Sequence, residues 1–198
     1  MTVNLFVNET RKQLSWMNRP ATWEFTDLDG LTLLAPPKSD FFQDPAGKHI
    51  ASSAPFLSVP VGDSFEMTTR ISVDMQHKYD SGCLMFMIDH HNWAKICFEF
   101  DGQHPIIVSV VTRAGMSDDC NSVKVAVDKP YLRITKQNHC VTLSYSEDGA
   151  NWALIRYFGM NEGAECVAGV VAQSPQGEGC SVSFDYLSLS ESKQESRF

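Results

Sequence analysis

Apolar and polar residues alternate with a period of two through much of the chain, which predicts short β-strands. In residues 92–100, NWAKICFEF, the apolar residues Ala94, Ile96, Phe98 and Phe100 alternate with Lys95, Cys97 and Glu99. Residues 65–75, FEMTTRISVDM, alternate in the same way. Successive side chains of a strand point to opposite faces of a sheet. We therefore expect residues 92–100 to place one face in a core and to carry charge on the other.

Further runs of this kind are separated by turn residues at a spacing of roughly ten residues. WEF at 23–25 and LTLL at 31–34 flank Asp29-Gly30 and predict a hairpin. The later runs are rich in β-branched and aromatic residues: VKVAV, YLRIT, CVTLSYS, WALIRYF, CVAGVVAQ and CSVSFDYLSL. Helical periodicity is absent from the sequence. The pattern predicts an all-β fold, a two-sheet antiparallel jelly-roll sandwich.

We expect one domain. Residues 1–15 lack a clean period and predict an N-terminal arm, residues 16–190 a single jelly-roll domain, and residues 191–198 a polar C-terminal tail. Residues 39–61 are rich in Pro, Ser and small side chains, and predict irregular loop with brief strand segments lying against the sandwich.

Charge, hydrophobic run length and cysteine spacing argue against several classes of function. The 198 residues carry a formal net charge of -8 with a pI near 5.1, which opposes binding to nucleic acid or to an acidic membrane surface. No apolar run approaches the about 20 residues of a membrane span, and no signal peptide is recognisable. The six cysteines include no CxxC and fall partly within strand patterns, so we expect reduced thiols. A cytoplasmic location follows as an expectation.

The candidate ligand-binding residues are Lys95, Glu99 and Arg113, with Ser109 and Tyr79 at the rim. Lys95 and Glu99 are four residues apart on one predicted strand, so they share a face, and Ser109 and Arg113 share a parity on the next. A carboxylate acceptor beside cationic donors suits a sugar or sugar-phosphate ligand. The alternative is an ion-paired network that only satisfies charges on a half-buried face.

A series of motifs in fixed order resembles the fungal regulation-of-enolase family, long labelled a domain of unknown function. These are SDFFQDP, APFL, YDSGCLMFMID, NWAKICFEFDG, SVVTRAGMSDD, YSEDGANWALIRYF and QSPQGEG, over residues 16–190. The resemblance implies a concanavalin A-like lectin/glucanase fold. It also implies a cytoplasmic role in restraining enolase expression or activity during galactose metabolism, with no agreed catalytic residues. Architecture transfers more safely than activity in such a fold.

Glycosidase chemistry is the rival hypothesis. Many glucanases of this fold carry the strand motif ExDxxE, whereas this chain has Glu99-Phe-Asp101-Gly-Gln-His104, with histidine in place of the last acid. An enzyme would need Glu99 and a second carboxylate from elsewhere, such as Asp89 or Asp118. The sequence therefore favours a binding protein over an enzyme.

An aromatic surface that stacks on sugar rings and a metal site are two further candidates. Trp93, Trp152, Tyr145 and Tyr157 could stack on sugar rings, but aromatic residues near a strand start more often pack the sandwich. His90-His91 beside Asp89 could bind a metal, but adjacent histidines on a strand or turn point apart. The loops with Asp118-Asp119 and Asp148-Gly149 lack EF-hand spacing. We expect neither a metal nor a cofactor.

These observations together predict a non-catalytic cytoplasmic regulatory protein of carbohydrate metabolism. Its working face would bind a small sugar or sugar-phosphate, or a protein partner such as enolase. The loop QSPQGEG at 173–179 would either gate that face or serve only as a hairpin connection.

Overall fold

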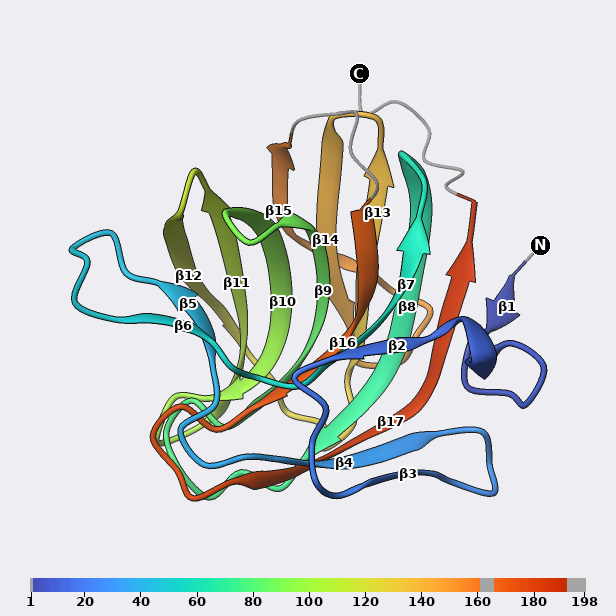
Figure 1. Cartoon of the computed structure of the whole chain (residues 1–198), viewed down its shortest axis with the longest axis horizontal. Helices are drawn as coiled ribbons and strands as arrows, with labels where there is room; N and C mark the ends of the chain where they lie inside the picture. Colours follow the sequence, from blue (N-terminus) through green and yellow to red (C-terminus); the bar gives the residue numbers. More distant parts are fainter. Residues whose placement is uncertain (1, 161–165, 192–198) are drawn as a thin grey trace.

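Two antiparallel β-sheets stack face to face in a computed structural model that describes residues 2–160 and 166–191 (Figure 1). The larger sheet has the order β15 (Ala153–Gly159), β14 (Cys140–Ser146), β13 (Tyr131–Gln137), β8 (Ser64–Val73), β17 (Cys180–Ser190), β4 (Leu31–Ala35), β3 (Trp23–Phe25), with β1 (Val3–Asn4) also paired to β17. The smaller sheet has the order β12 (Met116–Lys124), β11 (Pro105–Arg113), β10 (Asn92–Phe100), β9 (Ser81–Asp89), β16 (Cys166–Gln173), β7 (Phe56–Val61), β2 (Ser15–Met17). The predicted all-β two-sheet sandwich is confirmed.

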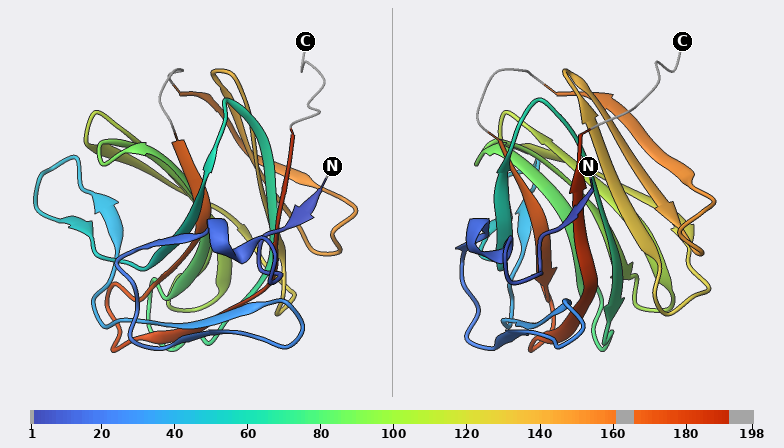
Figure 2. Two further views of the ribbon diagram at one scale, coloured as in Figure 1. Left: turned by 45° about the vertical axis from the view of Figure 1, so that its right-hand side comes forward. Right: turned by 90° about the vertical axis from the view of Figure 1, so that its right-hand side faces the viewer.

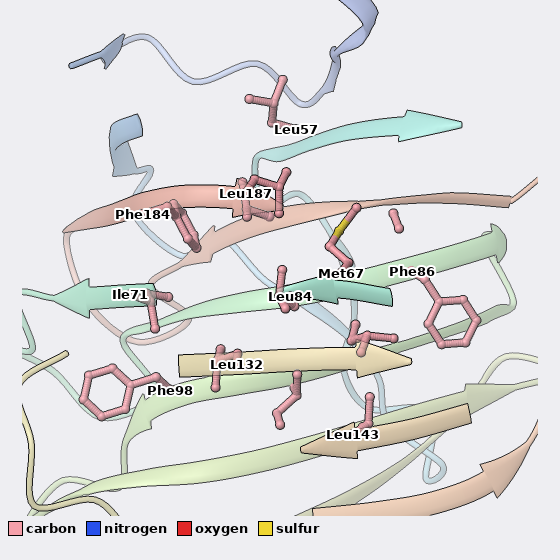
Figure 3. Close-up of a cluster of buried hydrophobic side chains, with 14 of the residues drawn as sticks. Leu57, Met67, Ile71, Leu84, Phe86, Phe98, Leu132, Leu143, Phe184 and Leu187 are labelled. Atoms are coloured by element: carbon pink, nitrogen blue, oxygen red, sulfur yellow. The ribbon is translucent and has the colours of Figure 1, made fainter. Parts of the chain in front are cut away.

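The main core lies between the two sheets, where the alternating positions of facing strands meet. Leu84 and Phe86 of β9 and Phe98 of β10 pack there against Met67 of β8 and Leu132 of β13 (Figure 3). Each of these side chains is at most 2% exposed. Burying such a side chain contributes about 1.5–3 kcal/mol, so the inner faces hold the sheets together. The outer faces are then free for other contacts.

The N-terminal residues lie against the sandwich. β1 pairs with β17, Leu5 and Phe6 are buried in the core, and a short 3-10 helix, η1 (Arg11–Gln13), leads into β2. Most of the predicted tail at 191–198 lies outside the described residues. The division into an arm, one domain and a tail stays a prediction. Within the described residues, no helix is both long enough and apolar enough to span a lipid bilayer.

A small hairpin covers part of the outer face of the smaller sheet. β5 (Phe41–Gln43) pairs with β6 (Ile50–Ser52), and Phe41 packs with Trp93, Cys97 and Met85 in a second apolar cluster on that face. In the left view of Figure 2, this hairpin lies outside the two stacked layers, on the side of the smaller sheet. The outer face of the smaller sheet is therefore partly enclosed.

Most predicted strands are present and one is displaced. The hairpin around Asp29-Gly30 is confirmed as β3 and β4, and Asp29 has a φ of 56°. The strand expected over 123–127 is instead β12, at 116–124, a polar edge strand with mostly exposed residues. All six cysteines are free thiols, as expected.

Candidate functional site

A cavity of about 400 Å³ opens on the outer face of the smaller sheet, between the sheet and the β5–β6 hairpin. Strands β10, β11 and β12 form its floor, and the loops before β5, β9 and β17 form its walls. Its lining residues are Asp40, Phe42, His49, Tyr79, Lys95, Glu99, Val108, Val110, Asp119, Gln173, Pro175 and Gln176. A volume of this order suits a small ligand.

Lys95 is the fixed cation of the cavity and is only 2% exposed. Its Nζ donates to Phe41 O and Gln173 Oε1, both at 2.8 Å, and lies 3.7 Å from Asp40 Oδ1. Burial by itself would lower the pKa of Lys95, but the Cys97 sulfur and the Asp40 carboxylate raise it above its ordinary value. The ammonium is therefore charged. Two of its N–H groups bond acceptors in β5 and β16, and the Asp40 carboxylate in the loop before β5 lies within ion-pair distance.

Glu99 lies four residues further along β10, on the same face as Lys95, and is 7% exposed. Among the described residues, its carboxylate makes no hydrogen bond and no ion pair within bonding distance. Burial raises the pKa of Glu99 well above its ordinary value, and the charge of Lys95 offsets this only in part. A carboxyl group that is largely buried, open to the cavity and without a protein partner marks a place where a ligand could supply a contact.

The cavity rim is built from the β5–β6 hairpin and from β12. His49 Nε2 lies 3.1 Å from Asp40 Oδ2, and the His49 ring stacks on Phe42 at a centroid separation of 6.4 Å. Asp119 is on the same face as Lys95, because Lys95, Val110 and Asp119 form one cross-strand row. Partial burial raises the pKa of Asp119. The rim thus offers exposed polar groups and one aromatic stack.

The loop 173–179 is anchored rather than free. Ser174 Oγ donates to Asp80 Oδ1 at 2.6 Å, and the other Asp80 oxygen accepts the backbone N–H groups of Gln76 and His77. Asp80 and Ser174 are fully buried. This buried junction joins the loop before β9 to the loop before β17, and so positions Tyr79 and Gln173 at the cavity.

Two of the five predicted binding residues do not reach the cavity. Lys95, Glu99 and Tyr79 line it, whereas Ser109 and Arg113 point to the opposite face of β11. Ser109 is fully buried within the sandwich, and its Oγ has no hydrogen-bond partner in the described chain. Arg113 donates to Gly159 O at 2.9 Å and lies over the Phe158 ring. Grouping them with Lys95 was wrong, because Lys95 pairs with Val110, so the neighbouring strand presents its even-numbered residues.

The expected second carboxylates also lie elsewhere. Asp101 accepts the backbone N–H groups of Gln103 and His104 in the β10–β11 turn, and Asp89 accepts from His91 N in the β9–β10 turn. Asp118 pairs with Arg156 across the sheets at 2.8 Å. The carboxylates that do share the cavity with Glu99 are Asp40 and Asp119.

Sequence reasoning missed these two acids together with His49 and Gln173. Asp40 and Gln173 stand in the motifs SDFFQDP and QSPQGEG, so both motifs of the family resemblance border the cavity. The position of Asp40 and Gln173 within these motifs could have identified them as candidate site residues.

The aromatic candidates mainly pack. Trp93 is 1% exposed in the cluster under the β5–β6 hairpin, which confirms packing over stacking for this residue. Trp152 lies under the Arg133 guanidinium at 4.0 Å, and Tyr145 packs against the main core. Phe42, which the sequence did not single out, lines the cavity together with the rings of His49 and Tyr79.

Replacing Glu99 with glutamine is expected to stabilise the protein increasingly as the pH rises. Burial in the folded state raises the pKa of Glu99. The charge of Lys95 opposes this rise, whereas Cys83, Asp119 and Asp40 add to it. Its favourable contribution is therefore complete below the ordinary pKa near 4.5 and is lost as the pH rises through the folded-state pKa. In urea unfolding, we expect the gain to be small near pH 5 and to reach about 1–3 kcal/mol near pH 8.

The matched control for this experiment is Glu24→Gln, which removes an exposed carboxylate on β3. Its effect on the free energy of unfolding should be the same at both pH values. A Glu99→Gln gain that does not change with pH would show that the carboxyl group is not held protonated by burial.

The sequence pattern of the family described as "Protein of unknown function (DUF1349)" matches residues 16–192. "Regulation of enolase protein 1" of Saccharomyces cerevisiae is 27% identical over 183 residues, covering 92% of this chain and 91% of that protein. The crystal structure of a functionally unknown protein from Saccharomyces cerevisiae superposes with a TM-score of 0.86 at 27% identity, covering 92% of this chain and 98% of that one.

More distant structures show the fold alone. The GH43 protein BlXynB from Bacillus licheniformis, in a mutant form, has a TM-score of 0.74 at 12% identity, and the match covers 91% of this chain but 37% of that longer protein. The exoplasmic/lumenal domain of VIP36 has a TM-score of 0.62 at 12% identity, covering 98% of this chain and 90% of that one. These likenesses confirm the predicted lectin/glucanase type of sandwich, and the pattern over residues 16–192 confirms the resemblance found in the sequence. The chain belongs to the family of proteins of unknown function designated DUF1349.

Proposed function

We propose that this protein is a non-catalytic regulatory protein of carbohydrate metabolism that binds a small sugar-type ligand in the cavity around Lys95 and Glu99. The observation that carries the proposal is the buried Glu99 carboxyl group, which lines an open cavity without a protein partner. Sugar hydroxyls both donate and accept, so they could complete such a group, while Val108, Val110 and Phe42 offer apolar surface to ring C–H groups.

The regulatory part of the proposal draws on the likeness to "Regulation of enolase protein 1". Enolase, or another enzyme of the same metabolism, would be the protein partner, and the cytoplasm the place of action. Surface plasmon resonance with immobilised yeast enolase, with and without galactose, tests this part. Absence of binding under both conditions would count against direct contact with enolase.

A thermal-shift series with galactose, glucose, their phosphates and short glucans tests ligand binding. A ligand that binds only the folded state at about 100 times its Kd adds about 2.7 kcal/mol. For a chain of this size, that corresponds to a rise in Tm of about 5–10 °C. No shift with any of these compounds would overturn the sugar proposal.

The location of binding is tested by Val108→Phe, which puts a ring into the cavity. The matched control is Val123→Phe, which adds the same ring at an exposed position of β12. We expect the shift to vanish in the first variant and to persist in the second. Equal shifts in both would place the ligand elsewhere.

A glycoside hydrolase is the second candidate function, and the presence of Asp119 in the same cavity as Glu99 favours it. Glu99 with a raised pKa would be the acid and Asp119 the base or nucleophile. Hydrolysis of nitrophenyl glycosides that is lost in both Glu99→Gln and Asp119→Asn would replace the non-catalytic proposal with this one.

A further inference from the structure

Two buried cysteines face each other across neighbouring strands. Cys83 of β9 and Cys97 of β10 are direct partners in the antiparallel register, on the outer face of the smaller sheet. Both side chains are fully buried. Each of the other four cysteines is opposite residues of other types: Ser109 for Cys120, Gln137 and Gly159 for Cys140, Val61 for Cys166 and Ala35 for Cys180. The register thus brings the thiols of Cys83 and Cys97 together.

The backbone places this pair where opposed side chains approach closely. Phe100 N donates to Asp80 O at 3.1 Å and Phe100 O accepts from Tyr79 N at 2.7 Å, so Phe100 is at a hydrogen-bonded position of the ladder. Such positions alternate with non-hydrogen-bonded ones, so Cys97, three residues away, is at a non-hydrogen-bonded position. Cα atoms there are about 4.5 Å apart, and a disulfide accepts about 4.4–6.8 Å. Joining the two sulfurs therefore needs no change of register.

The hydrogen bond between Lys95 and Gln173 spans the cysteine pair. Cys83 and Cys97 share a cross-strand row with Val171 of β16. Lys95 lies on β10 on one side of this row, and Gln173 lies on β16 on the other side, with β9 between them. The line from Lys95 to Gln173 therefore crosses β9 at Cys83. Both residues line the cavity, so their 2.8 Å bond covers the thiols on the cavity side.

The two thiols differ in acidity. Burial by itself would raise the pKa of Cys83, but hydrogen bonding by the Cys97 side chain and the charge of Lys95 lower it. Burial and Cys83 raise the pKa of Cys97, and burial raises the pKa of Cys180 to about 12. The thiolate is the reactive form of cysteine, so Cys83 is the nucleophile of the pair and Cys97 the thiol that follows.

We propose that Cys83 and Cys97 form a redox-modification site, at which a peroxide that enters the cavity converts the dithiol to a disulfide. The Cys83 sulfur attacks one oxygen of hydrogen peroxide, the O–O bond breaks, and a sulfenic acid and one water form. The Cys97 sulfur then attacks the Cys83 sulfur, and the S–O bond breaks as a second water leaves with the Cys97 proton. Two thiols thereby lose two electrons and two protons, and the peroxide becomes two waters. The site does not depend on the proposed sugar binding.

The disulfide should be readily reduced. Cβ atoms of opposed residues in antiparallel strands are about 4.5–5.5 Å apart, whereas a disulfide holds them about 3.5–4.5 Å apart. The strands must draw together, and such strain makes a disulfide more reducible. We therefore expect reduced glutathione to restore both thiols.

Peptide mapping of the full chain tests the site. Trypsin cleaves after Lys95 and so places Cys83 and Cys97 on separate peptides, 79–95 and 96–113, each with one cysteine. The reduced protein is treated with hydrogen peroxide, its remaining thiols are alkylated in denaturant, and it is digested. We expect the two peptides to be joined, with the loss of two hydrogen atoms. In protein oxidised in urea, all six thiols compete, so this product should be minor.

Gln173→Ala is the matched variant, because it removes the side-chain acceptor of Lys95 above the pair. The joined peptides should form at least about threefold faster than in the unchanged chain. Gln176→Ala trims the same loop at an exposed position and should leave the rate unchanged. Equal rates in all three proteins would overturn the covering role of the Lys95–Gln173 bond.

The remaining outcomes decide the site itself. Recovery of Cys83 and Cys97 as alkylated thiols, while the exposed Cys120 is oxidised, would overturn the proposal. A main product in which either residue is joined to another cysteine, or is oxidised to a sulfinic acid, would do the same. Peptides that stay joined after reduced glutathione is added to the folded protein would overturn the expected reversibility.

Discussion

Replacing Lys95 with methionine is expected to lower the free energy of unfolding by about 3–5 kcal/mol. Methionine retains the apolar stem but removes the ammonium, which leaves Phe41 O and Gln173 Oε1 without their donor and Asp40 without its buried cation. The cost arises mainly from these buried groups, because removing one partner of a buried pair leaves the others uncompensated. Urea unfolding followed by fluorescence measures the change, and Tm should fall by about 6–20 °C.

The loss should be specific to the buried position. Lys12→Met, which changes an exposed lysine of η1 in the same way, is the control and should alter stability by less than about 0.5 kcal/mol. The double variant Lys95→Met with Asp40→Asn should be more stable than Lys95→Met alone, because it no longer buries a carboxylate that has lost Lys95 and retains only its contact with His49. Equal loss in Lys12→Met and Lys95→Met would contradict the role assigned to the Lys95 contacts.

The contacts of Lys95 stabilise the fold and also shape the cavity. Lys95 joins β10 to β5 and to the end of β16, residues that are 54 and 78 positions away in the chain. The Lys95 ammonium therefore holds the walls of the cavity in place. Glu99, four residues further along β10, forms no bond of this kind with the described residues. Lys95, which bonds two other strands, and Glu99, which bonds none of the described residues, therefore have different roles, although their spacing in the sequence suggests one pair.

Alternation within single strands could be predicted from the sequence, and it correctly placed Lys95 and Glu99 on one face of β10. The relation between strands could not, because it depends on the length and shape of the connecting turn. Phe100 pairs with Pro105 across the β10–β11 turn, and this register gives the two strands opposite parity. Ser109 therefore points into the sandwich, and Val108 and Val110 form the cavity floor.

The missed parts of the site share a physical cause. Asp40 and Gln173 reach Lys95 from loops distant in sequence, and no local pattern encodes such contacts. β12 escaped prediction because it is an edge strand, exposed along most of its length, where no buried face imposes alternation. As a result, Asp119 was interpreted as part of a loop rather than as a strand residue that lines the cavity.

Replacing Gly169 with alanine is expected to lower the free energy of unfolding by about 3 kcal/mol or more. A Cβ at this position of β16 would lie 1.9 Å from Leu57 O and 2.7 Å from the Ser58 Cα, so β7 would have to move away. Both neighbours are backbone atoms of a paired strand, and no change of rotamer can relieve the overlap. Urea unfolding measures the loss.

Gly62→Ala is the matched control for Gly169→Ala, since a Cβ there meets nothing within 4 Å and its φ is not left-handed. Alanine reduces the freedom of the unfolded chain, so this control should be neutral or stabilised by about 0.4–1 kcal/mol. Ligand binding provides a second readout, because β16 ends at Gln173, which lines the cavity. Displacing β7 from β16 should therefore weaken ligand binding. The measurement is made at temperatures where Gly169→Ala is still folded. Unchanged stability of Gly169→Ala would contradict the close contact between the β7 backbone and Gly169 of β16.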